Sequence, residues 1–386
     1  MRVSQAYRGR GQKGPGRLVI RADEPTLTPY AGLAVTGELA RRLGLAGLID
    51  AELAIEHRAR PVKQRRRGLT AGELLVALAE SQLAGGDCFD DLEDVRADAA
   101  GAGLRAVAAT PAAPTARQLA RRFRRSHLQR VERALAQAGQ RLDQALGRQA
   151  SAPVTIDLDA TESPVYGAGK RGARRSRTGQ LAYAPYVAIW AERGRALACE
   201  LEPGNKTKLA AAESARLARR ALKLLPADHG AVTFRVDSAF YAVEFLAALR
   251  RWGARFTVSC SRTTAMWQAL AAIPQDAWTP AVDMDHAEVA ETDYSPDGWT
   301  HQPLRLLVRR VRYTAAQLSR DPRARRRRTI PPDQLQLALD GKLGVVYGYS
   351  FILTDLDGDA RQVEWFHRQR AQVEERIVRH EVARVE

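Results

Sequence analysis

The sequence predicts a mixed α/β domain that follows an all-helical domain, and three observations predict this order. Apolar residues before residue 150 recur at helical spacing, whereas the apolar period changes from about 3.6 to about 2 at Ser151. After Ser151, strand patterns first follow one another and then alternate with helical patterns, which is typical of a sheet covered by helices. The 386 residues are enough for about two to three domains.

The N-terminal part begins with a basic, Gly-rich stretch. Residues 1–22 have little apolar surface to bury, so a flexible arm is expected there. Residues 23–150 are expected to be all-helical. Thr70 and Glu73 predict a capping box at the start of one helix, and Gly85 predicts its end.

A second capping box is predicted at Thr115 and Gln118, and the apolar spacing after it indicates one helix over 115–146. Its basic face could enter a DNA groove, but such a face is at least as often solvated surface. The arginines concerned are Arg117, Arg121, Arg124 and Arg125.

The second domain is expected to span residues 151–386. Its first strand is predicted in APVTIDLDAT at 152–161, where apolar and polar residues alternate. Further strands are predicted at 183–191, 196–202, 231–236, 254–259 and 350–356, and helices at about 206–225, 239–251 and from about 360. Residues 262–345 break this pattern with polar, Pro-containing sequence and one clear strand at 304–313, which indicates an insertion.

The charge of the chain points to a polyanionic partner. Sixty Lys and Arg against 44 Asp and Glu give a net charge of +16 and a pI near 10.3, which favours nucleic acid. Two basic clusters, KRGARRSR at 170–177 and RARRRR at 323–328, could neutralise phosphates along a DNA path. The residues expected to contact DNA there are Lys170, Arg171, Arg174, Arg175, Arg325, Arg326 and Arg327.

Other classes of protein are disfavoured. No apolar run approaches the roughly 18 to 20 residues of a membrane span, and the N-terminus lacks the apolar core of a signal peptide, so no membrane partner and a cytoplasmic location are expected. Cys88, Cys199 and Cys260 lie far apart, which argues against a disulfide framework or a cysteine zinc site. They are expected to be small buried hydrophobes.

Carboxylates stand where burial should be costly. Asp157 and Asp159 share one face of the first strand, and a carboxylate inside a sheet needs a partner, of which a divalent cation is one kind. Asp237 stands where a strand passes into a helix, a common ligand position in α/β sheets. Glu374 lies near a buried helical stripe and follows His367 and Arg370 at helical spacing.

Each carboxylate also has a plainer interpretation. Asp157 and Asp159 could stand on an exposed sheet face, and Asp237 could simply cap the helix that follows it. Glu374 alone would more often be a solvated helix charge. Their order along the chain favours convergence on one point.

Three motifs, in order, give the chain a family resemblance. IDLDATESPVYG, FRVDSAFY and the H-x2-R-x3-E run from His367 to Glu374 resemble the DDE transposases of bacterial insertion sequences, specifically the group with a Y-x2-R-x3-E signature. GGDCFDDLEDVRAD and PTARQLARRF resemble the helical region of that group, so the resemblance covers roughly residues 25–379. It assigns Asp159, Asp237 and Glu374 as the catalytic, metal-binding carboxylates.

The resemblance implies an RNase H-like catalytic core with a β-rich insertion, and a helical domain over 23–150 that binds DNA. It implies a nucleoid-associated endonuclease that uses Mg²⁺ or Mn²⁺ to cleave double-stranded DNA at the terminal inverted repeats, then transfers the strand into target DNA. Hard divalent ions prefer such carboxylate oxygens. By analogy alone, a homodimer on DNA is expected.

The chain departs from the family pattern in three places. His367 replaces the signature tyrosine, and Glu381 stands where a basic residue is usual. The chain ends at Glu386, soon after Glu374, where relatives continue, so a C-terminal truncation is expected. The alternative function is therefore a catalytically inactive DNA-binding remnant.

Five further side chains could serve either the site or the fold. His367 and Arg370 could contact phosphate or brace Glu374. Trp267, Trp278 and Trp299 could stack on flipped bases, although core packing is the more common role of tryptophan.

Overall fold

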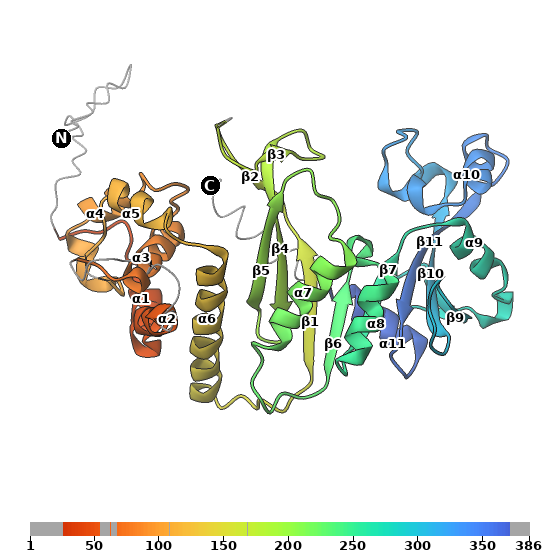
Figure 1. Ribbon diagram of the computed structural model, residues 1–386. Helices are drawn as coiled ribbons and strands as arrows, with labels where there is room; N and C mark the ends of the chain where they lie inside the picture. The colour runs from red at the N-terminus through yellow and green to blue at the C-terminus, as the bar shows by residue number, and fades with distance from the viewer. Residues whose placement is uncertain (1–25, 55–61, 63–67, 108, 168, 371–386) are drawn as a thin grey trace, which may run out of the picture. The chain divides into compact units, whose positions relative to one another are not determined.

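The computed structural model describes residues 26–54, 62, 68–107, 109–167 and 169–370 (Figure 1). The chain divides into two compact units, Met1–Leu146 and Gly147–Glu386, and each is described by itself. The division falls close to Ser151, where the apolar period changes. The arm expected over residues 1–22 and the carboxylate Glu374 lie outside the described residues.

The described part of the first unit is helical and has no strand. Its helices are α1 (Leu33–Leu43), α2 (Leu45–Ala54), α3 (Ala71–Leu83), α4 (Leu92–Ala97), η1 (Ala100–Leu104), α5 (Ala113–Ala120) and α6 (Arg125–Ala145), where η marks a 3-10 helix. The capping box of α3 is confirmed: the Glu73 N–H donates to Thr70 Oγ1 at 3.0 Å, and the Thr70 N–H donates to Glu73 Oε2 at 2.7 Å.

The single helix predicted over 115–146 is wrong, because two helices occupy this stretch. Pro114 stands in the first turn of α5, where proline is favoured, so α5 begins before Thr115 and Ala112 is its N-cap. Thr115 therefore caps nothing. Arg124 has an extended backbone (φ −120°, ψ 166°) that separates α5 from α6.

The described part of the second unit forms an 11-stranded sheet in the order β2-β4-β1-β6-β7-β11-β10-β9-β8, with β3 and β5 also paired to β4. Strands β1, β6 and β7 are parallel, and all other pairs are antiparallel. The strands are β1 (Val154–Ala160), β2 (Ser163–Pro164), β3 (Arg174–Arg175), β4 (Leu181–Trp190), β5 (Arg195–Pro203), β6 (Val232–Val236), β7 (Arg255–Cys260), β8 (Thr279–Pro280), β9 (Ala287–Tyr294), β10 (Leu304–Thr314) and β11 (Val345–Thr354). The predicted mixed α/β sheet is thus confirmed.

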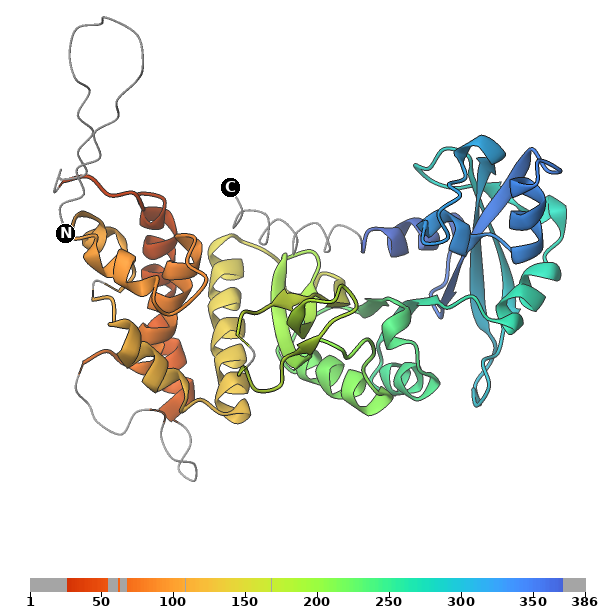
Figure 2. The ribbon, with the colours of Figure 1, turned by 90° about the horizontal axis from the view of Figure 1, so that it is seen from above.

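Helices cover both faces of this sheet. They are α7 (Ala211–Leu222), η2 (Ser238–Phe240), α8 (Val243–Arg251), α9 (Thr264–Ala271), η3 (Gln275–Ala277), η4 (Ala315–Gln317), η5 (Arg325–Thr329), α10 (Pro332–Leu339) and α11 (Ala360–Arg368). Figures 1 and 2 show α7 and α8 on one side of the central strands and α11 on the other.

The central strands have one apolar and one polar face, because side chains alternate along a strand. Ile156, Phe234 and Phe256 are in register across β1, β6 and β7, and all three are fully buried. On the opposite face, Asp157, Arg235 and Thr257 are in register and are buried too, with Asp157 and Thr257 fully inaccessible to water and Arg235 5% exposed. The chain therefore buries a polar row in the middle of its sheet.

The predicted insertion at 262–345 adds strands to this same sheet. Strand β10 pairs with β11 and β9, and β11 pairs with β7, so the strands beyond β7 continue the sheet without a break. Strand β9 was not predicted because acidic residues interrupt its apolar pattern. Those residues meet arginines of β10: Glu288 accepts from Arg310 at 2.7 Å, and Glu291 accepts from Arg305.

Two further expectations are settled by burial. Cys260 is buried as expected, but the expectation is wrong for Cys88 and Cys199, which are exposed. Trp278 and Trp299 are buried and Trp267 packs edge-on against Phe351, as core packing requires. No helix in the described part of the chain is long and apolar enough to cross a membrane.

Candidate functional site

The two carboxylates of β1 are both buried. Asp157 is fully inaccessible and Asp159 is 7% exposed, so the interpretation of an exposed sheet face is wrong. Their face is covered by α11 rather than by solvent. Buried carboxylates need compensating partners, and the two residues have different ones.

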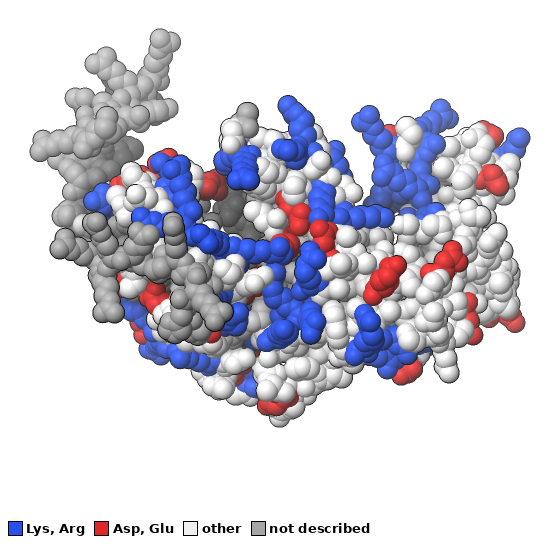
Figure 3. All heavy atoms as spheres, viewed as in Figure 1, with Lys and Arg blue, Asp and Glu red and all other residues white. Residues whose placement is uncertain are grey.

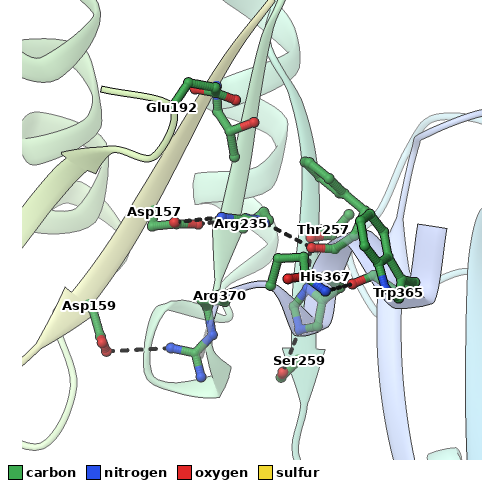
Figure 4. Close-up of polar contacts among 12 residues, drawn as sticks. Asp157, Asp159, Glu192, Arg235, Thr257, Ser259, Trp365, His367 and Arg370 are labelled. Atoms are coloured by element: carbon green, nitrogen blue, oxygen red, sulfur yellow. Dashed lines mark hydrogen bonds and ion pairs between the residues drawn. The ribbon is translucent and has the colours of Figure 1, made fainter. Parts of the chain in front are cut away.

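Asp157 is bound by an arginine. Arg235 on β6 donates from Nε and Nη2 to the two carboxylate oxygens of Asp157, both at 2.7 Å (Figure 4). Burial raises the pKa of Asp157, and the ion pair with Arg235 opposes that rise. Since both oxygens already accept from a guanidinium, Asp157 is poorly suited to hold a metal ion.

Asp159 and Asp237 are brought together by the register of two parallel strands. Leu158 of β1 is paired with Val236 of β6, so Asp159 and Asp237 are the next residues on each strand. Adjacent strands lie about 4.8 Å apart, and residues at matching positions point to the same face. The two carboxylates therefore stand side by side at the carboxyl ends of β1 and β6, on the face that carries α11.

Each of these carboxylates also accepts a backbone hydrogen bond. The Ala160 N–H donates to Asp159 Oδ1 at 2.9 Å, and the Ala239 N–H donates to Asp237 Oδ1 at 2.8 Å. Asp237 is thus an N-cap, but of the short η2 turn rather than of one helix over 239–251. Capping occupies one oxygen, and within the described residues Oδ2 of Asp237 has no hydrogen-bond donor.

Helix α11 crosses the polar face from β10 toward β1. Its Val363 packs on Leu307 and Ile352. Its Glu364 is fully buried and accepts from Arg309 Nη1 at 2.5 Å and from Arg368 Nε at 3.0 Å. These contacts fix the beginning and middle of α11 over β10 and β11.

His367 attaches the end of α11 to β7. Its Nδ1 lies 2.7 Å from Thr257 Oγ1 and its Nε2 lies 2.9 Å from Ser259 Oγ (Figure 4). Burial, and secondarily the positive charge of Arg370 nearby, lowers the pKa of His367 to about 3. A buried neutral ring with hydroxyls at both nitrogens anchors α11 and has no nitrogen left for a phosphate.

Arg370 reaches the carboxylate pair. Its Nη1 lies 3.4 Å from Asp159 Oδ1, at the long limit of a hydrogen bond. Glu374, the third expected carboxylate, lies outside the described residues. Within the described residues, no three His, Cys, Asp or Glu side chains lie close enough together to hold a metal ion.

Both predicted basic clusters lie at the same end of the sheet as Asp159 and Asp237. Strand β3 pairs with the start of β4, beyond Val187, the partner of Asp159. Turn η5 contacts β11 near Gly348, beyond the residues of β11 that pair with β7. Figure 3 shows Lys and Arg gathered in both places. The exposed members are Lys170, Arg171, Arg174, Arg175, Arg325 and Arg326, and Arg327 is half-buried.

Sequence reasoning missed the residues that hold this arrangement, Arg235, Thr257, Ser259 and Glu364. A signal was available for three of them, Arg235, Thr257 and Ser259. In TFRVD and RFTVSC, polar residues alternate with buried apolar ones, as they do in the first strand. Three neighbouring strands with this alternation indicate a shared polar face.

Comparison with solved structures finds six matching chains. One is the piggyBac transposase, in a synaptic complex with hairpin DNA, at 11% sequence identity and a TM-score of 0.36. The match covers 89% of this chain and 66% of the piggyBac chain, less than two thirds of its length. No curated protein matches the chain.

Comparison with protein families is more specific. Residues 12–323 match the family described as transposase DDE domain group 1. This range contains Asp159 and Asp237 and covers most of the chain. The chain therefore belongs to the transposases with a group 1 DDE domain.

Proposed function

We propose that this chain is a DNA transposase of an insertion sequence whose Asp159, Asp237 and Glu374 hold two Mg²⁺ or Mn²⁺ ions. It would cleave double-stranded DNA at the terminal inverted repeats and join the freed 3′ end to target DNA. The single observation that carries the proposal is the pairing of Leu158 with Val236, because Asp159 and Asp237 are the next residues on these two parallel strands.

The strand order supports an RNase H-like core for this chemistry. Strands β5, β4, β1, β6 and β7 lie in that order, with β4 antiparallel to β1 and with β6 and β7 parallel to it. This is the order expected of an RNase H-like sheet. Ligands of open α/β sheets bind outside the carboxyl ends of parallel strands, where Asp159 and Asp237 stand.

The donor set suits a hard divalent cation. Asp159 and Asp237 offer carboxylate oxygens, and Mg²⁺ and Mn²⁺ prefer such oxygens over imidazole or thiolate. Asp159 is buried close to the Arg370 guanidinium, and a divalent cation would give this carboxylate a stronger charge partner. Two bound ions would lower the pKa of the attacking water or 3′-hydroxyl and neutralise the departing oxygen.

The remaining groups would bind and orient the DNA. The clusters of β3 and η5 lie at the carboxylate end of the sheet, where each neutralised phosphate would strengthen binding without reading sequence. Arg370 would shift from Asp159 to a phosphate oxygen once cations bind. Two copies of the chain would hold the two ends, because both ends must meet before joining.

A nicking assay tests the proposal. The substrate is a supercoiled plasmid that carries the encoding gene with its flanking DNA, and nicked circles are measured with Mg²⁺, with Mn²⁺ and with EDTA. We expect metal-dependent nicking that Asp159→Asn and Asp237→Asn each abolish, with DNA binding retained. Asp228→Asn, at an exposed turn before β6, is the matched control and should nick normally.

Two outcomes contradict the proposal. Nicking that survives both Asp159→Asn and Asp237→Asn would show that the site is elsewhere. Tight DNA binding without nicking by the unaltered chain, in any metal, would favour the inactive DNA-binding remnant.

A further inference from the structure

Arg235 contacts α11 in addition to forming its ion pair with Asp157. Its side chain is about 5% exposed, and Nε and Nη2 are both used on Asp157. The remaining nitrogen, Nη1, donates to the carbonyl oxygen of Phe366 at 2.9 Å. The guanidinium carbon also lies 4.9 Å from the centre of the Phe366 ring. Arg235 therefore joins β1 and β6 to α11.

The point of attachment is the last turn of α11. The carbonyl groups of a final helical turn lack normal helical partners and carry partial negative charge, so a cation is favourable there. The neighbouring His367 is fixed to Thr257 and Ser259 in the same turn. Two polar attachments thus meet at the end of α11 that leads to Arg370 (Figure 4).

Stability alone does not explain this buried pair. A buried ion pair is often no more stabilising than apolar side chains of similar volume, because both charges lose their hydration. The neighbouring rows on the opposite face are filled by apolar residues such as Phe234. The pair instead fixes relative positions, because the planar guanidinium of Arg235 donates to three acceptors at once. These are the two carboxylate oxygens of Asp157 and the carbonyl oxygen of Phe366.

We propose that Arg235 is a positioning residue, which fixes the end of α11 over the carboxyl ends of β1 and β6 so that the site around Asp159 and Asp237 is completed from α11. This inference rests on the proposed function. Asp157 serves it by holding the guanidinium in place, and this role occupies both of its carboxylate oxygens.

The register makes the coupling direct. Arg235 stands two residues before Asp237, so the same short strand carries a metal-binding carboxylate and the group that positions α11. Arg370, just beyond α11, already lies 3.4 Å from Asp159. A shift of the helix end would therefore move the groups that face the scissile phosphate.

The test separates positioning from stability by removing both charges together. In Asp157→Leu/Arg235→Met no buried charge is left unpaired, so we expect urea unfolding close to that of the unaltered protein. We expect nicking to be slower by about 100-fold, as misplacement by about 1 Å can cause. Mn²⁺ affinity, measured by EPR of free Mn²⁺, should fall by about 10-fold.

A matched control removes another cross-strand pair of the same sheet. Arg310 and Glu288 pair at 2.7 Å between β10 and β9, so Arg310→Met/Glu288→Leu should change neither nicking nor Mn²⁺ affinity. Hydrogen exchange of the amides in 360–370 gives a readout without activity. These amides should exchange faster in the Asp157/Arg235 variant than in the control.

Each outcome decides one of the two proposals. Unchanged nicking, Mn²⁺ affinity and α11 exchange in the double variant would overturn the positioning role. If the unaltered chain neither nicks nor binds Mn²⁺, the proposed function fails, while exchange still tests the attachment of α11. Should the double variant not fold, Arg235→Lys replaces it, because lysine can pair with Asp157 but cannot also reach Phe366.

Discussion

The two faces of the central sheet differ in the kind of contact that they make. One face is filled by apolar residues that include Ile156, Phe234 and Phe256, all fully buried against the side that carries α7 and α8. Such burial is the main source of folding free energy. On the other face, α11 is held by an ion pair, by hydroxyl contacts to His367 and by buried Glu364.

The difference teaches where stability and function reside in this sheet. Apolar packing tolerates some change of shape, because it has no directional requirement. Hydrogen bonds and ion pairs require particular distances and angles, so they specify the position of α11 more sharply than apolar contacts would. The polar face thus adds less folding free energy than the apolar face, because its buried charges lose their hydration. Asp159 and Asp237 lie on this polar face.

The largest effect on stability is expected from the apolar face. Phe234→Ala removes a fully buried ring from the middle of the sheet and should lower the unfolding free energy by about 3–5 kcal/mol. Urea unfolding followed by tryptophan fluorescence checks this, since all six tryptophans lie in the second unit.

Thr233→Ala, on the adjacent position of β6, is the matched control for this comparison. Thr233 is half-buried and points to the polar face, so its loss should cost under about 1 kcal/mol. An equal decrease in unfolding free energy for Phe234→Ala and Thr233→Ala would show that the apolar face does not contribute more stability than the polar face.

The polar face is expected to make stability depend on pH. In the unfolded chain His367 takes up a proton near its ordinary pKa of 6.5, whereas in the folded chain burial lowers its pKa to about 3. Between these values the unfolded state binds more protons, so stability falls as pH decreases from 6.5, by about 1.4 kcal/mol per pH unit.

Comparison of variants isolates this contribution. His367→Gln should remove that part of the slope, whereas His286→Asn, at an exposed histidine, should keep it. The measurement is the unfolding free energy at pH values from 7 down to about 4. The same slope in His367→Gln as in the unaltered chain would show that His367 is not held neutral.

The comparison of faces also shows what the sequence could predict. Elements with a regular apolar period were predicted, including β1, β6 and β7 and the capping box of α3. Strand β9 was missed because its acidic residues are paired with arginines of β10, and such pairing is invisible in a period. The prediction of one helix over 115–146 was wrong because Pro114 lies in the first turn of a helix that begins earlier, and because the extended backbone of Arg124 separates α5 from α6.

The candidate site was predictable in part. Asp159 and Asp237 were predicted because each ends an apolar strand, which is a local property of the sequence. The ion pair of Asp157 with Arg235 joins residues 78 positions apart and depends on the register of two strands. No local pattern carries that information. The family resemblance singled out Asp159, but the ion pair that occupies Asp157 could be found only in the structure.

A smaller effect is expected from one hydroxyl of the His367 attachment. Thr257→Val keeps the shape of the side chain but leaves His367 Nδ1 without its hydroxyl partner in a position that water cannot reach. A buried unsatisfied group of this kind costs about 2 kcal/mol. Urea unfolding measures the loss, and a neutral result would mean that the ring nitrogen finds another partner.

The smallest effect is expected from the other hydroxyl. Ser259 is half-buried, so in Ser259→Ala water can replace the lost contact to His367 Nε2, and the cost should be about 1 kcal/mol or less. Because Ser259 follows Asp159 and Asp237 in the same row across the sheet, nicking should respond more than stability does. A larger stability loss for Ser259→Ala than for Thr257→Val would reverse the order that burial predicts, and the attachment of α11 would then depend on its solvent side.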